Sequence, residues 1–237
     1  MNVKGNDSAW LFDEFAHAGE EHLDPAYVAT YDRKAATDPG EDVTTLRNLG
    51  LGADSTLVDL GAGTGTFTMA AAPFCRSVVA VDVSTAMLTL LRAKIEHLGL
   101  TNVTCVRAGF LTYRHPPGTA DFVYSRNALH HLPDFWKALA LERIAAMLRP
   151  GGILLLRDLV FSFALRDAAN VVEAWLAAAP QNPDEGWTRT ELETHLREEY
   201  STFSWLFESM LEHSGFEILK VSHRPSAVFS AYTVVRR

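Results

Sequence analysis

The chain is poor in the features that mark secreted and membrane proteins. Two cysteines, Cys75 and Cys105, occur among 237 residues, so we expect two reduced thiols rather than a disulfide framework. No apolar run approaches the about 20 residues of a membrane span. The first residues, 1–7, lack the apolar core of a signal peptide. These absences predict a cytoplasmic protein with no membrane partner.

Clusters of basic residues are also missing. The chain has 21 Lys and Arg against 29 Asp and Glu, which gives a formal charge of −8. Nucleic-acid binding depends on clustered positive charge, so a nucleic-acid partner is disfavoured. The length and the 48% hydrophobic content fit one domain with a full core.

A glycine-rich turn is the most informative stretch that the chain does contain. An apolar run ends at Asp59, glycines follow at 61, 63 and 65, and a helix-like segment begins at about Thr66. Glycine is needed where φ is positive or where a ligand approaches the backbone. The first N–H groups of a helix are free to bind a negatively charged group. The pattern predicts a strand, a tight turn and a helix that bind a nucleotide-like ligand.

A second apolar strand, 77–82, also ends in an acid. Asp82 lies 17 positions after Gly65, near the spacing of about 20 residues at which a carboxylate binds ribose hydroxyls in such folds. We therefore expect Asp82 to bind a ribose and Ser84 to cap the following helix. The alternative is a helix-capping or solvated loop acid.

Strand and helix patterns alternate along the middle of the chain, which implies a parallel sheet with helices on both faces. The expected strands are 56–60, 77–82, 103–107, 120–125 and 153–158. The expected helices between them are 66–73, 85–98 and 134–148. Further helices are expected at Ala9–His17, Pro25–Ala36, Asp42–Leu49, Ala164–Ala179, Arg189–Tyr200 and Phe203–His213. Two closing strands are expected at Phe216–Ser222 and Phe229–Val235.

Three motifs, taken in order, resemble those of the class I S-adenosylmethionine-dependent methyltransferases. Asp-x-Gly-x-Gly-x-Gly at 59–65 resembles the first motif of the family, and 121–132 resembles its fourth-strand motif. Leu-Arg-Pro-Gly-Gly at 148–152 resembles its turn into strand five. The resemblance covers about residues 53–160. It implies an α/β fold of the Rossmann-like type: a doubly wound, mostly parallel seven-stranded sheet with an antiparallel C-terminal strand and helical lids.

The resemblance also divides the chain into four segments. They are an N-terminal helical lid (1–52), a cofactor-binding core (53–160), a helical insertion or lid (161–214) and C-terminal strands that complete the sheet (215–237).

S-adenosyl-L-methionine is the cofactor that the resemblance implies. The residues expected at the cofactor are Tyr31, Asp59, Gly61, Ala62, Gly63, Thr64, Gly65, Asp82, Val83, Met87, Gly109, Phe110, Arg126 and Asn127. In this family the residues after strand three commonly include an acid for the adenine amino group, but here 106–111 contain none. We expect backbone near Gly109 and packing on Phe110 to hold the adenine instead.

Methyl transfer from a sulfonium requires an oriented acceptor and, for a protonated acceptor, a base. The catalytic candidates are His130, His131 and Asp158, because they lie near the expected ligand-facing ends of strands four and five; capping or packing is the alternative for the histidines. The candidates for substrate binding are Arg157, Glu199 and Tyr200, although Arg157 and Asp158 could simply pair with each other. No metal ligands are predicted.

We interpret the chain as a monomer or homodimer that carries out S-adenosylmethionine-dependent methyl transfer to a small molecule. The aromatic-rich segment 161–214 and the helix around Tyr31 are expected to roof a partly apolar pocket. One alternative is an NAD(P)-dependent oxidoreductase of the dinucleotide-binding fold. Asp59 and the missing third-spaced glycine of G-x-G-x-x-G argue against it. A cofactor-binding protein without transfer activity is the second alternative, which the sequence leaves open.

Overall fold

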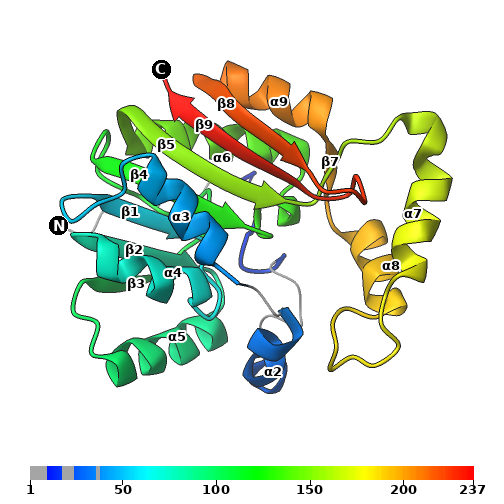
Figure 1. Ribbon diagram of the computed structural model, residues 1–237, viewed down its shortest axis with the longest axis horizontal. Coiled ribbons are helices and arrows are strands. Elements are labelled where there is room, and N and C mark those ends of the chain that lie inside the picture. Colours follow the sequence, from blue (N-terminus) through cyan, green and yellow to red (C-terminus); the bar gives the residue numbers. More distant parts are fainter. Residues whose placement is uncertain (1–9, 18–23, 36–37) are drawn as a thin grey trace.

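A seven-stranded sheet forms the centre of the computed structural model, which describes residues 10–17, 24–35 and 38–237 (Figure 1). The strand order is β3-β2-β1-β4-β5-β9-β8. The strands are β1 (Thr56–Leu60), β2 (Ser77–Asp82), β3 (Val103–Arg107), β4 (Ala120–Arg126), β5 (Leu148–Asp158), β8 (Phe216–His223) and β9 (Ser230–Arg236). Strands β1 to β5 pair in parallel, and β9 runs antiparallel to both β5 and β8. The expected mostly parallel sheet with an antiparallel C-terminal strand is confirmed.

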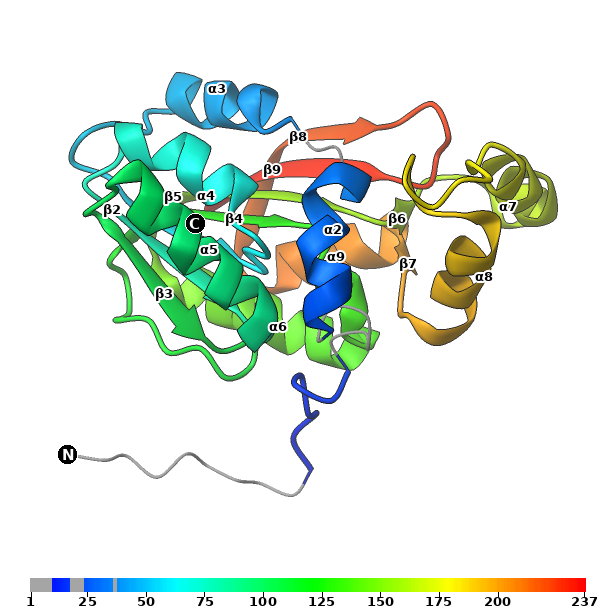
Figure 2. The same ribbon diagram turned by 90° about the horizontal axis from the view of Figure 1, so that it is seen from below.

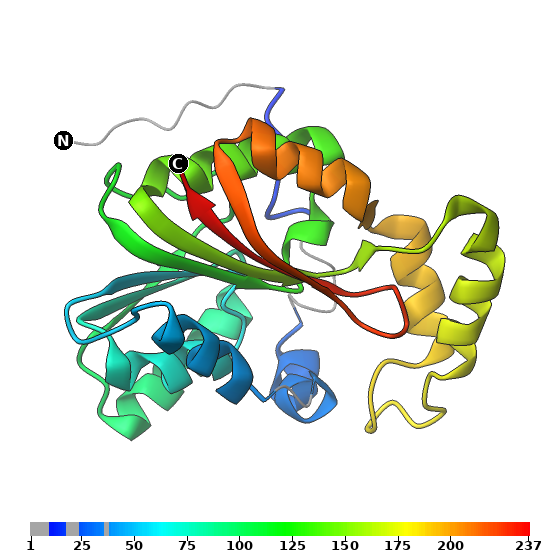
Figure 3. The ribbon, with the colours of Figure 1, turned by 45° about the horizontal axis from the view of Figure 1, so that its top comes forward.

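Helices cover both faces of the sheet (Figure 3). One face carries α3 (Gly40–Asn48), α4 (Thr66–Ala71) and α5 (Thr85–Leu98), and the other carries α6 (Asp134–Met147) and α9 (Ser204–His213). Successive side chains of β5 point to opposite faces of the sheet, so this buried strand packs against the helices on both faces. Ile153 and Leu155 pack in the core beneath α3 and α4, whereas Leu154 and Leu156 pack in the core beneath α6 and α9.

Two helical segments lie beyond the carboxyl edge of the parallel strands. Helix α2 (Pro25–Ala35) packs against α5 near the turn after β1 (Figure 2). Helices α7 (Ala168–Ala177) and α8 (Arg189–Glu198) project together from the body of the molecule (Figure 1). A short parallel pair, β6 (Val160–Phe161) with β7 (Thr202–Phe203), joins the two ends of this projection. The pair closes the part of the chain between β6 and β7 at its base, whereas α9, which follows β7, packs on the sheet.

The expected helix at Ala9–His17 is wrong for its described residues, 10–17, which form turns and irregular backbone. The Asp13 carboxylate accepts hydrogen bonds from the N–H groups of Phe15 and Ala16, at 3.0 and 3.2 Å. Such local bonds offer the backbone an alternative to helical hydrogen bonding.

The remaining elements lie within a few residues of their predicted positions. Helix α3 begins at Gly40 rather than Asp42, and a 3₁₀ turn (Leu165–Asp167) precedes a shorter α7 than expected. The β6–β7 pair was not predicted. None of the helices in the described ranges has the length and apolar character needed to cross a bilayer.

Candidate functional site

The three glycines after β1 have different surroundings, although all have positive φ. A Cβ on Gly61 would lie 2.3 Å from the Ala128 Cβ, and one on Gly65 would lie 2.0 Å from Leu91 Cδ1. A Cβ on Gly63 would meet nothing within 4 Å. Gly61 and Gly65 therefore allow close packing, whereas Gly63 presents open backbone to a cavity.

Asp82 holds this turn in place from the end of β2. Its Oδ2 accepts a hydrogen bond from the N–H of Gly63 and its Oδ1 accepts one from Ser84, both at 2.8 Å. Ser84 in turn accepts from the N–H of Met87 as the predicted cap of α5. A carboxylate oxygen can accept more than one hydrogen bond.

Asp59 lies behind the turn and is almost fully buried, with Thr68 donating to its carboxylate. Burial raises the pKa of Asp59 to about 7; the nearby Asp82 charge adds to the rise, and the hydrogen bond from Thr68 opposes it. Asp59 therefore changes charge near neutral pH rather than near pH 4.

A cavity at the carboxyl edge brings together most of the predicted cofactor residues. Those that line it are Tyr31, Gly61, Gly63, Asp82, Val83, Met87, Gly109, Phe110, Arg126 and Asn127. A hollow beside it is lined by Asp59, Ala62 and Thr64 and shares Tyr31, Gly61 and Gly63 with the first. Gly65 packs against Leu91 at the start of α4 instead.

The N-terminal segment supplies a residue that the sequence interpretation missed. Glu14 is buried beside Gly109, and its carboxylate accepts hydrogen bonds from the Leu111 N–H at 2.9 Å and from the Thr112 hydroxyl at 3.1 Å. Burial raises its pKa, although these hydrogen bonds oppose the rise. Glu14 lines the cavity and places an acid beside the loop after β3, where the sequence itself has none. Because Glu14 is nearly 100 residues away, no local motif could have revealed it.

Helix α2 is fastened to the glycine turn by charged and polar contacts. Asp32 accepts a hydrogen bond from the Thr64 hydroxyl and forms an ion pair with Lys94 of α5. Lys94 also donates to the Thr64 carbonyl at 3.2 Å. These contacts hold Tyr31, the residue before Asp32, at the edge of the cavity.

A second cavity of about 280 Å³ lies between α2, the segment that follows β4 and the α7–α8 projection. Tyr31 and Asn127 line both cavities, so the two adjoin there. The aromatic walls of the second cavity are Tyr27, Tyr31, Trp175, Trp187 and Phe229. Its polar wall includes His130, His195 and Glu199. The segment from 161 to 214 thus contributes to a partly apolar cavity beside the first one.

The predicted catalytic residues occupy different places. Asp158 is buried and accepts hydrogen bonds from the N–H groups of Leu129 and His130, at 2.9 and 3.1 Å, and contacts His130 Nδ1. His130 Nε2 lies 3.0 Å from Glu199 Oε2. Burial opposes protonation of His130, but Asp158 and Glu199 outweigh it and raise the pKa of His130 to about 9. His131 lines the first cavity.

Two of the residues predicted to bind substrate, Arg157 and Tyr200, have side-chain partners within the protein. Arg157 pairs with Asp42 and Glu41 of α3, so Arg157 and its neighbour Asp158 do not pair with each other; their side chains leave β5 on opposite faces. Tyr200 packs its ring against Phe12.

Comparison with known proteins gives a consistent result. A family model described as a methyltransferase domain matches residues 57–152. An uncharacterized methyltransferase of Anoxybacillus flavithermus is 30% identical over 162 residues, 68% of this chain and 69% of the relative. An uncharacterized methyltransferase of Bacillus mycoides is 28% identical over 220 residues, 90% of this chain and 92% of the relative.

A solved structure extends the likeness to the fold. Haemonchus contortus Phospholethanolamine N-methyltransferase 2, in complex with phosphomonomethylethanolamine and S-adenosylhomocysteine, aligns with a TM-score of 0.69 and 15% identity. The alignment covers 95% of this chain and 61% of that chain.

The sheet order, the glycine turn and the acidic strand ends define a Rossmann-like methyltransferase. The chain belongs to the class I S-adenosylmethionine-dependent methyltransferase family.

Proposed function

We propose that the chain binds S-adenosyl-L-methionine in the first cavity and transfers its methyl group to a small molecule in the second. The observation that carries the proposal is the junction of the two cavities at Tyr31 and Asn127. A methyl donor on one side of this junction and an acceptor on the other would be adjacent, as in-line transfer requires. When bound, the cofactor supplies a methyl group already activated on a sulfonium.

The residues of the first cavity fit this cofactor chemically. The Asp82 carboxylate would accept from the ribose hydroxyls while retaining its bonds to the glycine turn. The Asp59 carboxylate behind the turn suits the methionine ammonium, and the open side of Gly63 leaves room for it. Glu14, beside Gly109, would accept from the adenine amino group. Phe110 lines the same end of the cavity and would pack on the adenine ring.

The second cavity suits a small acceptor rather than a polymer. Five aromatic side chains and no Lys or Arg are among the residues that line it, and α7 and α8 form part of its wall. Trp175, Trp187 and Phe229 would exclude water and hold an apolar part of the acceptor. His131, which lines the cofactor cavity, stays the prediction for the group that takes an acceptor proton.

Calorimetry with S-adenosylmethionine, S-adenosylhomocysteine and NAD tests the cofactor. We expect both S-adenosyl compounds to bind in the micromolar range and NAD not to bind. Binding of NAD alone would support the oxidoreductase alternative. A screen of small acceptors for release of S-adenosylhomocysteine, with and without Trp187→Ala, then tests the second cavity. Turnover on a nucleic acid or protein but on no small molecule would refute the acceptor class.

A further inference from the structure

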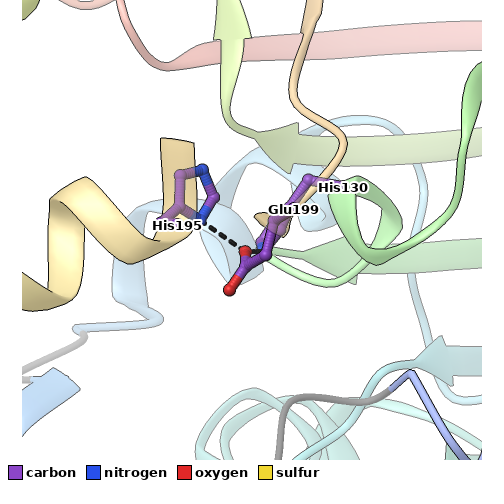
Figure 4. A group of neighbouring side chains, drawn as sticks. All are labelled: His130, His195 and Glu199. Atoms are coloured by element: carbon purple, nitrogen blue, oxygen red, sulfur yellow. Dashed lines mark ion pairs between the residues drawn. The ribbon is translucent and has the colours of Figure 1, made fainter. Parts of the chain in front are cut away.

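Three potential metal ligands converge in the second cavity. His130, His195 and Glu199 each place one ligand atom within 4.8 Å of the other two (Figure 4). His195 lies on α8 and Glu199 immediately follows it, four residues later and so on the same helical face. His130 lies in the 3₁₀ turn η2 (Leu129–His131), after β4. The cluster thus joins the core to the α8 segment.

Glu199 contacts both histidines of the cluster through one carboxylate oxygen. Glu199 Oε2 lies 3.0 Å from His130 Nε2 and also contacts His195 Nδ1. This oxygen is buried, and apart from the two imidazoles it has no hydrogen-bond partner in the described part of the chain. Three potential ligand atoms lie around one point, and a metal ion bound there would take the place of the proton on His130.

In each imidazole, the ring nitrogen that faces away from Glu199, here called the outer nitrogen, already has a partner. His130 Nδ1 contacts Asp158, whose other oxygen accepts from the backbone of the same turn. His195 Nε2 lies 2.8 Å from the Ser201 hydroxyl. In metal sites such outer contacts fix the ring orientation and leave the inner nitrogen's lone pair for the ion. Both rings are therefore held with a ligand nitrogen facing Glu199.

We propose that His130, His195 and Glu199 form a binding site for a divalent transition-metal ion, with Zn²⁺ as the test case. Two imidazoles and one carboxylate suit such ions, and three protein ligands leave a coordination position free. All three residues line the second cavity, so the free position opens into it. An acceptor bearing a hydroxyl, thiol or carboxylate would complete the coordination there and be held as its anion.

Metal binding itself is independent of methyl transfer; only the role of the free position in holding the acceptor rests on the proposed function. The alternative is that the ion pairs of Glu199 with His130 and His195 hold α8 against the core without a metal; we call this arrangement the ionic staple. The two interpretations differ in metal content and in the response of stability to added metal, and neither readout requires turnover.

The test begins with the full chain stripped by a chelator and dialysed. We expect calorimetry with Zn²⁺ to give one site per chain and elemental analysis after desalting to give a matching zinc content. Zn²⁺ should also raise the midpoint of thermal unfolding, since it binds only the folded cluster.

Variants then locate the site. His195→Gln and Glu199→Gln should each weaken Zn²⁺ binding by at least about 100-fold, because loss of outer-shell partners alone costs about 10- to 100-fold. His213→Gln, which replaces an exposed histidine on α9, should bind as the parent chain does.

Zinc well below one equivalent, or equal binding by His195→Gln and the parent, would overturn the metal site. If the variants lower the unfolding midpoint equally with and without Zn²⁺, the staple is the correct description. S-adenosylhomocysteine binding to the stripped chain is measured in parallel. Its loss would count against the proposed function, whereas loss of zinc binding alone would not.

Discussion

Arg157 of β5 donates a hydrogen bond to Asp42 of α3, a carboxylate that is 1% exposed. Asp42 also accepts from the Tyr124 hydroxyl at 2.7 Å and from Arg126 at 3.3 Å. One buried carboxylate thus ties α3 to two central strands close to the carboxyl edge. This arrangement gives Arg157 a structural partner, in place of the free guanidinium that substrate binding would use.

Asp42→Asn is expected to destabilise the fold by about 3–5 kcal/mol, because it removes the buried partner of Arg157 and leaves only the exposed Glu41 beside that charge. Urea unfolding at neutral pH measures the loss. Glu41→Gln is the matched control: Glu41 pairs with the same Arg157 at 3.3 Å, but its side chain is 77% exposed. Its removal should cost less than about 1 kcal/mol. Equal losses in the two variants would contradict the central role of Asp42.

Periodicity and motif order were sufficient to predict the sheet and most of the residues that line the cavity at its carboxyl edge. Alternating apolar strands and amphipathic helices have short-range signatures, and the glycine turn and Asp82 each depend on a spacing within one β–α–β unit. The strand positions and most of the first cavity followed from these signals.

Contacts between distant segments could not be predicted in the same way. Glu14 reaches a loop nearly 100 residues later, and Asp42 meets Arg157 from 115 residues away. His195 and Glu199 do have a readable spacing, but nothing local relates them to His130. In the sequence, a single acid or histidine in a helical pattern is indistinguishable from a solvent-exposed side chain. Its partner becomes evident only in the folded structure.

Gly63 and Gly65 should respond differently to the same substitution. In Gly65→Ala the new methyl would meet the fully buried Leu91, and the backbone at φ +85° would be strained. Overpacking and left-handed backbone together should cost about 2–4 kcal/mol. Gly63→Ala meets nothing within 4 Å and should cost only the about 1–2 kcal/mol of its positive φ.

Cofactor binding should show the opposite order. Gly63→Ala places its methyl in the cavity, so we expect it to weaken S-adenosylhomocysteine binding at least about tenfold while the chain stays folded. Calorimetry and thermal unfolding on the same two samples give both readouts. A Gly63→Ala chain that binds normally would remove this backbone from the cofactor site.

Asp82→Asn should weaken cofactor binding by about 1.5–3 kcal/mol, since charged acceptors contribute that much per hydrogen bond. Asparagine retains the size of the side chain and one acceptor oxygen, so much of the support for the glycine turn remains. Calorimetry with S-adenosylhomocysteine measures the loss, and Asp54→Asn, at an exposed turn residue, is the control. If both variants bind equally and both are folded, Asp82 does not bind the ribose.

Asp59 should make stability fall as the pH rises toward neutrality. Its pKa of about 7 in the folded chain, caused chiefly by burial, lies above the usual 3.8. Between these values the folded state holds a proton that the unfolded state has lost, so the free energy of unfolding decreases with pH. The stabilising contribution is complete below about pH 4 and lost above about pH 7, a change of about 4 kcal/mol.

Asp59→Asn provides the comparison, because it cannot ionise while the other titrating groups of the chain are retained. Urea unfolding of both chains at several values between pH 5 and 8 should show the parent losing stability relative to the variant up to about pH 7 and no further. Binding of the cofactor ammonium favours the ionised carboxylate, so cofactor affinity of the parent should rise from pH 6 to 8, and that of the variant should rise less. A stability difference that stays constant with pH would mean that Asp59 is already ionised in the folded chain at pH 5.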